Sequence, residues 1–393
     1  MHEAESQNIR IRVLVATNAL EGGGAQRSNL NLATGLIELG FDVSVLTVRP
    51  AELDSVAALH PSIALIDLGE LRWPRWTRGL SVLRATLRTV RREQTNVVIS
   101  GSFGLNQILL AARATRVLRR PLVVIEHLGI RFRLDVLGGE QGALRRAFRW
   151  LLSLLYQRVD CIVAVSRGVA DEFEAELRLP PRTVAVVHNG LDLEHIAKLA
   201  QQRPDTPFAD VFDELPRPRI ISVGRLERQK AQADLLQAFA TFHRMHGGSL
   251  TILGEGTLRE ELTALVETLG LSNSVKMPGH TSPPYWYVAQ SDLFVLSSIA
   301  EGHPLVLVES LACGTPVVST DCPSGPSEIL TDPTTGKLAR VANPASLCAE
   351  MTEALAIRQP IEFNLTRFNH QQPAQNIAAY IYELTRPKHP MIR

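Results

Sequence analysis

The chain has 393 residues, of which 45% are hydrophobic and 21% charged, a composition typical of folded globular proteins and unlike that of disordered ones. This length predicts about two domains, each with its own core. The four cysteines show no CxxC spacing, the N-terminus lacks the apolar core of a signal peptide, and no apolar run reaches the roughly 18 residues of a membrane span. These features argue against structural zinc, secretion and a transmembrane helix, so we expect a cytoplasmic protein.

Charge is unevenly distributed along the chain. Residues 1–190 contain 24 Arg and no Lys against 18 acidic residues, whereas the remainder has more acidic than basic residues although the whole chain has a net charge of +1. This asymmetry predicts an anionic partner for the first half only.

Short runs of Val, Ile and Leu alternate with helix-length amphipathic segments through the first half. A strand at 11–17, a glycine loop, a helix over Gln26–Leu39 and a strand at 42–48 form one βαβ unit, and Gly40 is placed to cap the helix. Continuous apolar strands between helices are typical of a parallel sheet covered on both faces. Further strands are predicted at 96–100, 121–125, 161–165 and 183–187.

A second alternating series follows residues 201–218, which are rich in Pro and Asp and lack periodicity. The sequence therefore predicts an α/β protein with two doubly wound, Rossmann-like domains facing each other across a central ligand cleft. Strands are predicted at 219–223, 249–253, 274–277, 292–296 and 315–319, and helices at 230–246, 257–269, 304–313 and 374–385. The predicted boundaries are 1–190 for the first domain, 191–217 for a linker, 218–365 for the second domain, and 366–393 for a C-terminal helix and tail that would pack back on the first domain.

Two carboxylates eight positions apart mark the segment EGHPLVLVE, residues 301–309. A Gly-x-Pro turn leads from Glu301 into an apolar stretch that should form a helix carrying Glu309. The unpaired N–H groups at a helix start bind phosphate well, and carboxylates beside them can hold sugar hydroxyls. We interpret the segment as part of a nucleotide-sugar site; the alternative is an ordinary strand–loop–helix connection with two solvated acids.

Two further segments carry groups suited to anions. Gly22, Gly23 and Gly24 lie between the first strand and helix, where the backbone can approach a ligand closely, although a turn without a ligand is the alternative. Arg225 and Lys230 follow the first strand of the second domain, where they could neutralise a diphosphate. A solvated surface is the alternative for Lys230, and Arg225 is the better candidate because it directly follows the strand end.

Two histidines are candidates for sugar or base contacts. His127 ends an apolar strand, and its imidazole could donate to a sugar hydroxyl or to developing negative charge. His280 lies on a loop after Gly279, where a contact to a base or ribose and an ordinary turn are both open. The sequence contains no Asp-x-Asp and no clustered His and Asp set, so we expect no catalytic metal. Gly-x-Ser-x-Gly and P-loop sequences are absent too, which argues against esterases and NTPases.

The segment 71–92 combines two tryptophans with seven arginines and no acidic residue. Basic residues beside interfacial tryptophans suit an anionic membrane surface. Nucleic acid is disfavoured because aromatic residues are few and the whole chain is not basic, and the remaining alternative is a helix that covers the sheet with solvated arginines. The similar segment 144–158 is a weaker candidate for membrane contact, and the alternative for it is a mostly buried helix. The predicted membrane contacts are Trp73, Trp76, Arg84, Arg88 and Arg91.

These residues belong to an ordered set of motifs that covers nearly the whole chain. The set resembles the large retaining glycosyltransferase family 4 (glycosyl transferases group 1), whose members have the two-domain GT-B architecture. The combination of GR-x4-K with E-x7-E is the most specific part of the resemblance. The matching pieces are GGGAQR at 22–27, EH at 126–127, VAVSRGVAD at 163–171, HNGLD at 188–192, SVGRLERQK at 222–230, LGEG at 253–256, PGH at 278–280 and EGHPLVLVESLACGTPVVSTD at 301–321.

The resemblance implies transfer of a sugar from a nucleoside diphosphate donor with retention at the anomeric carbon, without a cofactor or a protein nucleophile. In the family pattern Arg225 and Lys230 clamp the diphosphate, Glu301 holds the donor sugar and Glu309 holds the ribose. The remaining implied contacts are Gly279 and His280 to the base, His127 to the sugar near the reacting carbon, His303, Pro304, Leu305 and Val306 to sugar and phosphate, and Gly22, Gly23 and Gly24 to diphosphate and acceptor.

The chain departs from the family pattern at Ala231, where Gly is common, and at His303, where an apolar residue is frequent. The run PSGPSEIL at 323–330 resembles bacterial members that build lipid-linked or surface glycans. Together with the basic segment, it leads us to expect a lipid-linked saccharide acceptor at the cytoplasmic membrane face. The alternatives are a nucleotide-sugar 2-epimerase of related architecture, disfavoured by the GR-x4-K and E-x7-E pair, and a catalytically silent protein that binds sugar nucleotide or membrane.

Overall fold

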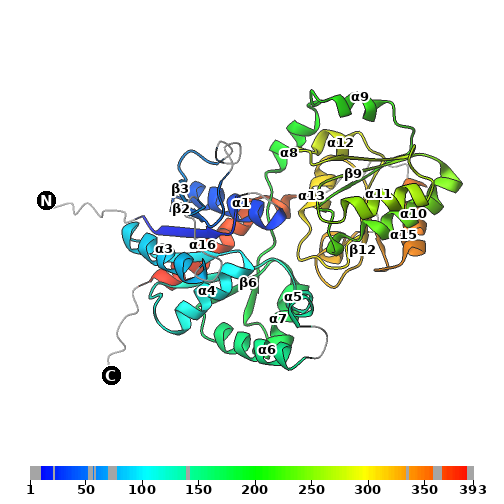
Figure 1. The fold of residues 1–393 in the computed structure, drawn as a ribbon. Coiled ribbons are helices and arrows are strands. Elements are labelled where there is room, and N and C mark those ends of the chain that lie inside the picture. Colours follow the sequence, from blue (N-terminus) through cyan, green and yellow to red (C-terminus); the bar gives the residue numbers. More distant parts are fainter. Residues whose placement is uncertain are drawn as a thin grey trace, which may run out of the picture. The chain divides into compact units, whose positions relative to one another are not determined.

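The computed structural model describes residues 10–20, 23–51, 56, 59–69, 78–138, 142–332, 336–356 and 365–386. The chain divides into two compact units, each built around a parallel sheet (Figure 1). Unit 1 comprises residues 1–165, 170–190 and 370–393, and unit 2 comprises residues 166–169 and 191–369.

In unit 1 the described strands form one sheet in the order β3-β2-β1-β4-β5-β6-β7, with every neighbouring pair parallel. Val and Ile dominate these strands because both faces of the sheet are covered. The strands are β1 Arg12–Thr17, β2 Asp42–Thr47, β3 Ala64–Asp67, β4 Val97–Ser100, β5 Leu122–Glu126, β6 Cys161–Ala164 and β7 Val184–Val186.

Helices cover both faces of this sheet, because right-handed crossovers on either side of β1 place helices on opposite faces. One face is covered by α1 (Gly24–Glu38) and α16 (Gln371–Thr385), which pack together where a Cβ on Gly35 would lie only 2.6 Å from the Cβ of Ala374. On the other face α3 packs against α4, and α4 against α6. Helices on this side are α3 Arg78–Arg92, α4 Phe103–Ala114, α5 Ile130–Gly138, α6 Ala143–Tyr156 and α7 Arg167–Leu177.

In unit 2 the described strands form a second parallel sheet in the order β10-β9-β8-β11-β12-β13. The strands are β8 Arg219–Val223, β9 Ser249–Leu253, β10 Val275–Gly279, β11 Leu293–Leu296, β12 Val317–Thr320 and β13 Gly336–Ala339. The helices are α8 Leu193–Ala200, α9 Pro207–Asp213, α10 Gln232–His246, α11 Arg259–Thr268, α12 Tyr285–Ala289, α13 Leu305–Ala312, α14 Pro326–Ile329 and α15 Pro344–Ala356, with 3-10 turns at Arg228–Lys230 and Thr366–Phe368.

Two apolar clusters hold this second sheet between its helices. One contains Phe239 and Met351 from α10 and α15, and the other contains Phe212 and Leu311 from α9 and α13. The structure thus differs from the prediction of a linker over 191–217: these residues form α8 and α9 and pack into the core of unit 2.

The predicted fold class is confirmed: both halves are doubly wound α/β units with parallel sheets. The predicted strands agree with the structure to within two residues at each end, and the C-terminal helix belongs to unit 1. The sequence did not predict the edge strands β3 and β13. No helix in the described ranges is both long and apolar enough to cross a bilayer.

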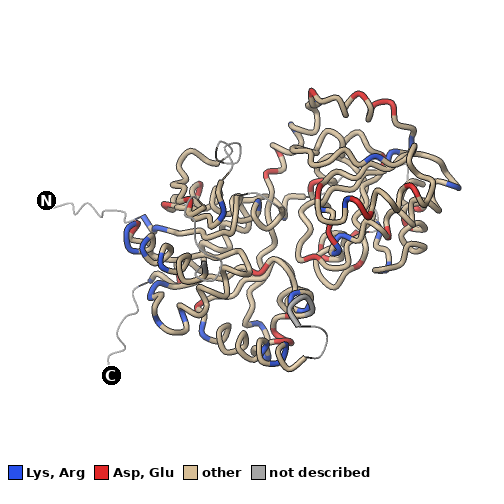
Figure 2. The backbone as a smooth tube through the Cα atoms, in the orientation of Figure 1, with Lys and Arg blue, Asp and Glu red and all other residues tan. Residues whose placement is uncertain are grey.

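Basic residues of unit 1 gather along α3 and α6 (Figure 2). Arg84, Arg88 and Arg91 are exposed, and the α3 segment contains no acidic residue. The arginines predicted to contact an anion therefore do face solvent.

Candidate functional site

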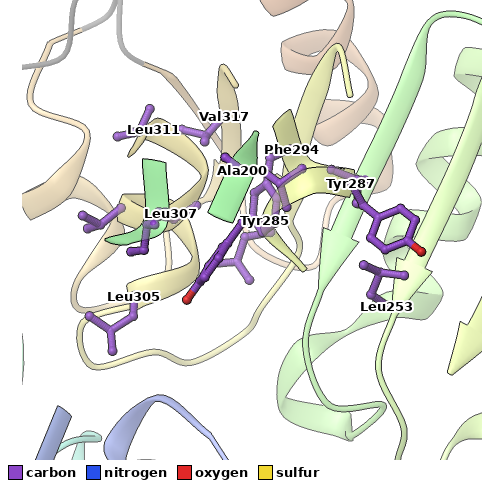
Figure 3. Packing of buried hydrophobic residues seen from close by; sticks show 14 of the residues in the cluster. Ala200, Leu253, Tyr285, Tyr287, Phe294, Leu305, Leu307, Leu311 and Val317 are labelled. Carbon is purple, nitrogen blue, oxygen red and sulfur yellow. The ribbon is translucent and has the colours of Figure 1, made fainter. Parts of the chain in front are cut away.

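Helix α13 follows the carboxyl end of β11 in unit 2 and provides the first part of the site. Its first turn contains no acidic residue, and Pro304 precedes it. Figure 3 shows Leu307 and Leu311 of α13 within the apolar cluster that also contains Tyr285 and Val317. Because this packing fixes the helix, its N-terminal N–H groups are held in a defined direction and can bind an anion.

Glu301 lies in the loop that leads into α13 and is only 7% exposed. Its Oε1 accepts hydrogen bonds from Lys230 Nζ at 2.6 Å and from Ser298 Oγ at 2.6 Å. Ser324 Oγ donates to the backbone carbonyl of Glu301 at 2.5 Å. A carboxylate held this way keeps a fixed orientation, because each of its neighbours is itself buried or half-buried.

Lys230 is positioned by the loop after β8, which is bound to the loop after β11. Ser297 Oγ donates a hydrogen bond to the carbonyl of Lys230 at 2.8 Å. Gln229 forms two further hydrogen bonds with the loop after β11. Its Nε2 donates to Ala300 O at 2.7 Å, and its backbone carbonyl accepts from Ile299 N at 2.9 Å. The next residue, Ala231, has φ 46° and ψ 44°, a left-handed conformation. This tight turn directs Lys230 toward Glu301 and starts α10.

The other predicted donor residues of unit 2 lie on the same loops and helix. Arg225 follows β8 and is exposed, while Glu309 lies within α13 and is 4% exposed. His303 is 5% exposed, and its ring centroid lies 5.6 Å from that of Phe368. Leu305 and Val306 begin α13, and Pro304 directly precedes them.

Glycines bring the carboxyl ends of the unit 2 strands into close contact. A Cβ on Gly254 would lie 2.0 Å from the carbonyl oxygen of Gly224, and a Cβ on Gly256 would lie 2.4 Å from that of Leu226. Gly279, at the end of β10, has a φ of 104°, and His280 beside it is exposed. Only glycine allows the backbone to pack this tightly and to adopt this conformation.

In unit 1, His127 follows β5 and its Nε2 lies 3.2 Å from Asn29 Oδ1. Asn29 Nδ2 donates to Gly101 O at 3.2 Å, so its Oδ1 faces the histidine and Nε2 carries the proton. Burial, together with the charge of Arg133, lowers the pKa of His127 to about 3, which keeps the ring neutral. The ring borders a cavity of about 410 Å³ whose lining also includes Gln26, Ser102 and Arg133.

A buried network that the sequence did not reveal surrounds Glu126, the residue before this histidine. Glu126 is fully buried; Tyr156 OH donates to its Oε1 at 2.5 Å, Asn106 Nδ2 to the same oxygen at 2.8 Å, and Arg133 NH1 to its Oε2 at 3.1 Å. Burial raises the pKa of both Glu126 and Tyr156. The only local signal was the EH dipeptide, because the other partners come from α4, α5 and α6.

The remaining predicted residues are the glycines around the start of α1 and two tryptophans. Gly23, with a φ of 153°, precedes α1, and Gly24 begins it. Gly22, Trp73 and Trp76 lie outside the described residues. Among the described residues, no group of three or more His, Cys, Asp or Glu is arranged to hold a metal ion. Of the predicted donor residues, Lys230 and Glu301 are joined by a direct bond, whereas the Arg225 guanidinium forms no ion pair with another described residue.

Comparison with protein families gives two adjoining matches. The model described as Glycosyltransferase Family 4 matches residues 22–195, and the model described as Glycosyl transferases group 1 matches residues 208–365. The chain belongs to the group 1 glycosyltransferases. The second match includes the Lys230–Glu301 pair and α13, and the first includes His127.

Several relatives of this chain are named for bacterial glycan synthesis. A Campylobacter jejuni enzyme named N-acetylgalactosamine-N,N'-diacetylbacillosaminyl-diphospho-undecaprenol 4-alpha-N-acetylgalactosaminyltransferase is 37% identical over 199 residues, 51% of this chain and 52% of that protein. The amylovoran biosynthesis glycosyltransferase AmsD of Erwinia amylovora is 25% identical over 365 residues, 92% and 93% of the two chains. The alignments with the first curated relatives thus span about half of those proteins' length.

Solved structures show the same fold. Anabaena HepE, crystallised in complex with UDP-glucose, matches with a TM-score of 0.71 and 20% identity over 95% of this chain and all of the other. This similarity, together with the two parallel sheets, identifies the GT-B fold.

Proposed function

We propose that this protein is a retaining glycosyltransferase that moves a sugar from a nucleoside diphosphate donor to a lipid-linked glycan acceptor. The observation that carries the proposal is the buried Lys230–Glu301 pair at the start of α13, where a cation for phosphate and a carboxylate for sugar hydroxyls lie 2.6 Å apart. Membership of the group 1 glycosyltransferases supports transfer rather than epimerisation. The structure of the Anabaena protein in complex with UDP-glucose supports a nucleoside diphosphate sugar as the donor.

Donor binding would use both the positive and the negative groups of unit 2. The diphosphate would take Lys230, Arg225 and the N–H groups at the start of α13 as its counter-charges. Once the ammonium of Lys230 turns to phosphate, Glu301 Oε1 would accept from the sugar hydroxyls while Ser298 still donates to it. Glu309 would hold the ribose, and the backbone at Gly279 and the exposed His280 would contact the base.

The chemical step requires little from the protein beyond charge and position. The bond between the anomeric carbon and the phosphate oxygen breaks, its electron pair leaves with the diphosphate, and the acceptor hydroxyl attacks from the same face. Its proton passes to the leaving phosphate oxygen, which accounts for retention without a protein nucleophile or a metal. Lys230 and Arg225 would stabilise the charge that develops on the diphosphate.

His127 would contact the sugar as a neutral ring. Because Nε2–H is directed to Asn29, the Nδ1 lone pair is the group that can accept from a sugar hydroxyl. A neutral imidazole beside an oxocarbenium-like centre avoids repulsion between like charges. The lowered pKa of His127 therefore suits this role.

The acceptor is inferred from the relative in Campylobacter jejuni, whose name specifies a diphospho-undecaprenol-linked saccharide. A lipid-linked acceptor requires the enzyme to work at a membrane surface, which we place at the cytoplasmic face. The exposed arginines of α3 supply positive charge for an anionic bilayer.

An assay of sugar transfer tests the proposed function directly. Purified protein, a panel of nucleoside diphosphate sugars and extracted lipid-linked saccharides are incubated together, and mass spectrometry follows the lipid product and the released nucleoside diphosphate. We expect a gain of one sugar, lowered by orders of magnitude in Glu301→Ala and Lys230→Ala and unchanged in the exposed control Arg203→Ala. Near-wild-type transfer in both site variants would reject the site, and a free epimerised sugar released without an acceptor would reject the reaction.

A further inference from the structure

Helix α6 of unit 1 exposes large apolar side chains instead of burying them. Leu144 is 70% exposed, Trp150 65%, Leu151 45% and Leu154 37%. On the opposite side of the helix Leu152 and Tyr156 are buried. The structure thus differs from the alternative of a mostly buried helix over 144–158, because only one side of an apolar helix can face the sheet.

The exposed side chains form one continuous stripe. Positions 144, 147, 151 and 154 are separated by three or four residues and so share a helix face, with Trp150 at its edge. The Ala143–Tyr156 segment contains no acidic residue, and Arg146 beside the stripe is exposed. Four of the 11 large exposed hydrophobic residues in the described chain lie on this helix, so the stripe is a local feature and not a general property of the surface.

Charge on the neighbouring helices favours one kind of partner. Helix α4 packs between α6 and α3, so the exposed arginines of α3 lie on the same side of the sheet as the α6 stripe. Leu80, 61% exposed, adds an apolar side chain at the start of α3. The acidic residue that faces α6 from α7 is Glu176, which is paired with Arg149 and Arg131. The surface is thus apolar along α6 and cationic along α3.

We propose that α6 is the element of this protein that inserts into an anionic lipid bilayer. Its axis would lie in the membrane plane, with Leu144, Leu151 and Leu154 among the upper acyl chains and Trp150 at the level of the headgroups. The arginines of α3 would contact lipid phosphates. This inference rests on the proposed membrane-linked acceptor and names the surface that reaches it.

Vesicle binding tests the proposal without any sugar substrate. Wild-type protein is titrated with phosphatidylglycerol–phosphatidylcholine vesicles that carry brominated acyl chains, and Trp150→Phe identifies the share of quenching that comes from Trp150 among the four tryptophans. We expect quenching of Trp150 and, in the triple variant Leu144→Ser, Leu151→Ser, Leu154→Ser, a fall in vesicle affinity of at least about tenfold. The replaced side chains are exposed, so the thermal unfolding of the variant should match the wild type.

A matched control removes exposed apolar side chains from unit 2. Val211→Ser with Met245→Ser, at positions 45% and 57% exposed, should leave vesicle affinity unchanged. Salt separates the two contributions: the affinity lost by replacing Arg84, Arg88 and Arg91 should be largest at low ionic strength and shrink as salt is added, whereas the affinity lost by replacing the α6 leucines should change little with salt. This contrast assigns insertion to α6.

Two results would overturn the proposal. One is unchanged vesicle affinity in the triple leucine variant. The other is a dimer, detected by sedimentation in the absence of vesicles, that the same substitutions dissociate. The stripe would then be a contact between two copies of the chain. Failure of the proposed function would appear separately, as loss of nucleotide-sugar binding in solution, which does not involve α6.

Discussion

Replacing Lys230 with Met should destabilise unit 2, because the substitution removes the cation from a carboxylate that the fold keeps buried. The Lys230 side chain is 17% exposed and that of Glu301 is 8% exposed, and their atoms lie 2.6 Å apart. Breaking a buried pair by removing one partner costs about 3–5 kcal/mol. The Ser298 hydrogen bond remains and water can reach part of the site, so we expect a loss of about 2–4 kcal/mol in the free energy of unfolding.

A double-mutant cycle isolates the interaction from other effects of the substitutions. Glu301→Gln and the double variant complete the cycle, and the coupling energy should reach about 2 kcal/mol. The matched control is Arg203 with Asp210, also in unit 2, whose atoms are likewise 2.6 Å apart but whose side chains are 44% and 79% exposed. Water screens both charges of such a surface pair, so its coupling should be much weaker than that of Lys230 with Glu301.

The assay is urea unfolding at pH 7, followed by circular dichroism and by tryptophan fluorescence, to which Trp286 of unit 2 contributes. The reasoning is refuted if the Lys230–Glu301 coupling is no larger than that of Arg203 with Asp210. Such a result would mean that the two charges are solvated and are not held against each other.

Three further outcomes follow from the structure. Ala231→Gly should raise the free energy of unfolding by about 0.5–1 kcal/mol, since Ala231 has a φ of 46°; a destabilised variant in urea unfolding would contradict this. The pKa of His127 is about 3 in the folded state and about 6.5 in the unfolded state, so the unfolded state binds the proton first as the pH falls below 6.5. At pH 5 the free energy of unfolding of the wild type should therefore have fallen by about 1–2 kcal/mol relative to that of His127→Gln. Parallel curves of stability against pH for the two proteins would disprove the lowered pKa. Replacing Arg84, Arg88 and Arg91 with Gln should weaken binding to anionic vesicles most at low salt, and a salt-independent change would exclude an electrostatic contact.

The parallel sheets could be predicted because central strands are apolar on both faces. The segments around Val97–Ser100 and Leu293–Leu296 are continuous apolar runs, and each follows a helix-length segment. The strands β3 (ALID) and β13 (GKLA) lie at the sheet edges and are only partly buried, so their sequences carry a weaker signal.

Helix α9 lies where its Pro and Asp residues predict a linker. Pro207 occupies the first turn of this helix, where proline has no N–H to lose, and Phe212 anchors the helix in the core. The orientation of α6 could not be predicted for a different reason. Its apolar residues cover one wide face of the helix, and the periodicity does not show that only the part with Leu152 and Tyr156 is buried.

The donor residues of unit 2 could be named from their motifs, but their mutual contacts could not. Lys230 and Glu301 are 71 positions apart, and their bond depends on how the loops after β8 and β11 are joined. The Glu126 network could not be anticipated either, since Tyr156 and Arg133 reach it from separate helices. Local patterns identify such residues only when neighbours in sequence are also neighbours in space.

Donor binding tests the central claim most directly. The thermal unfolding of wild type, Lys230→Ala and Glu301→Ala is measured with a panel of nucleoside diphosphate sugars, because a ligand at 100 times its Kd stabilises the folded state by about 2.7 kcal/mol. We predict that at least one nucleotide sugar raises the Tm of the wild type and that both substitutions abolish this shift. Protection by none of the panel, or equal protection of all three proteins, would contradict a nucleotide-sugar site at Lys230 and Glu301.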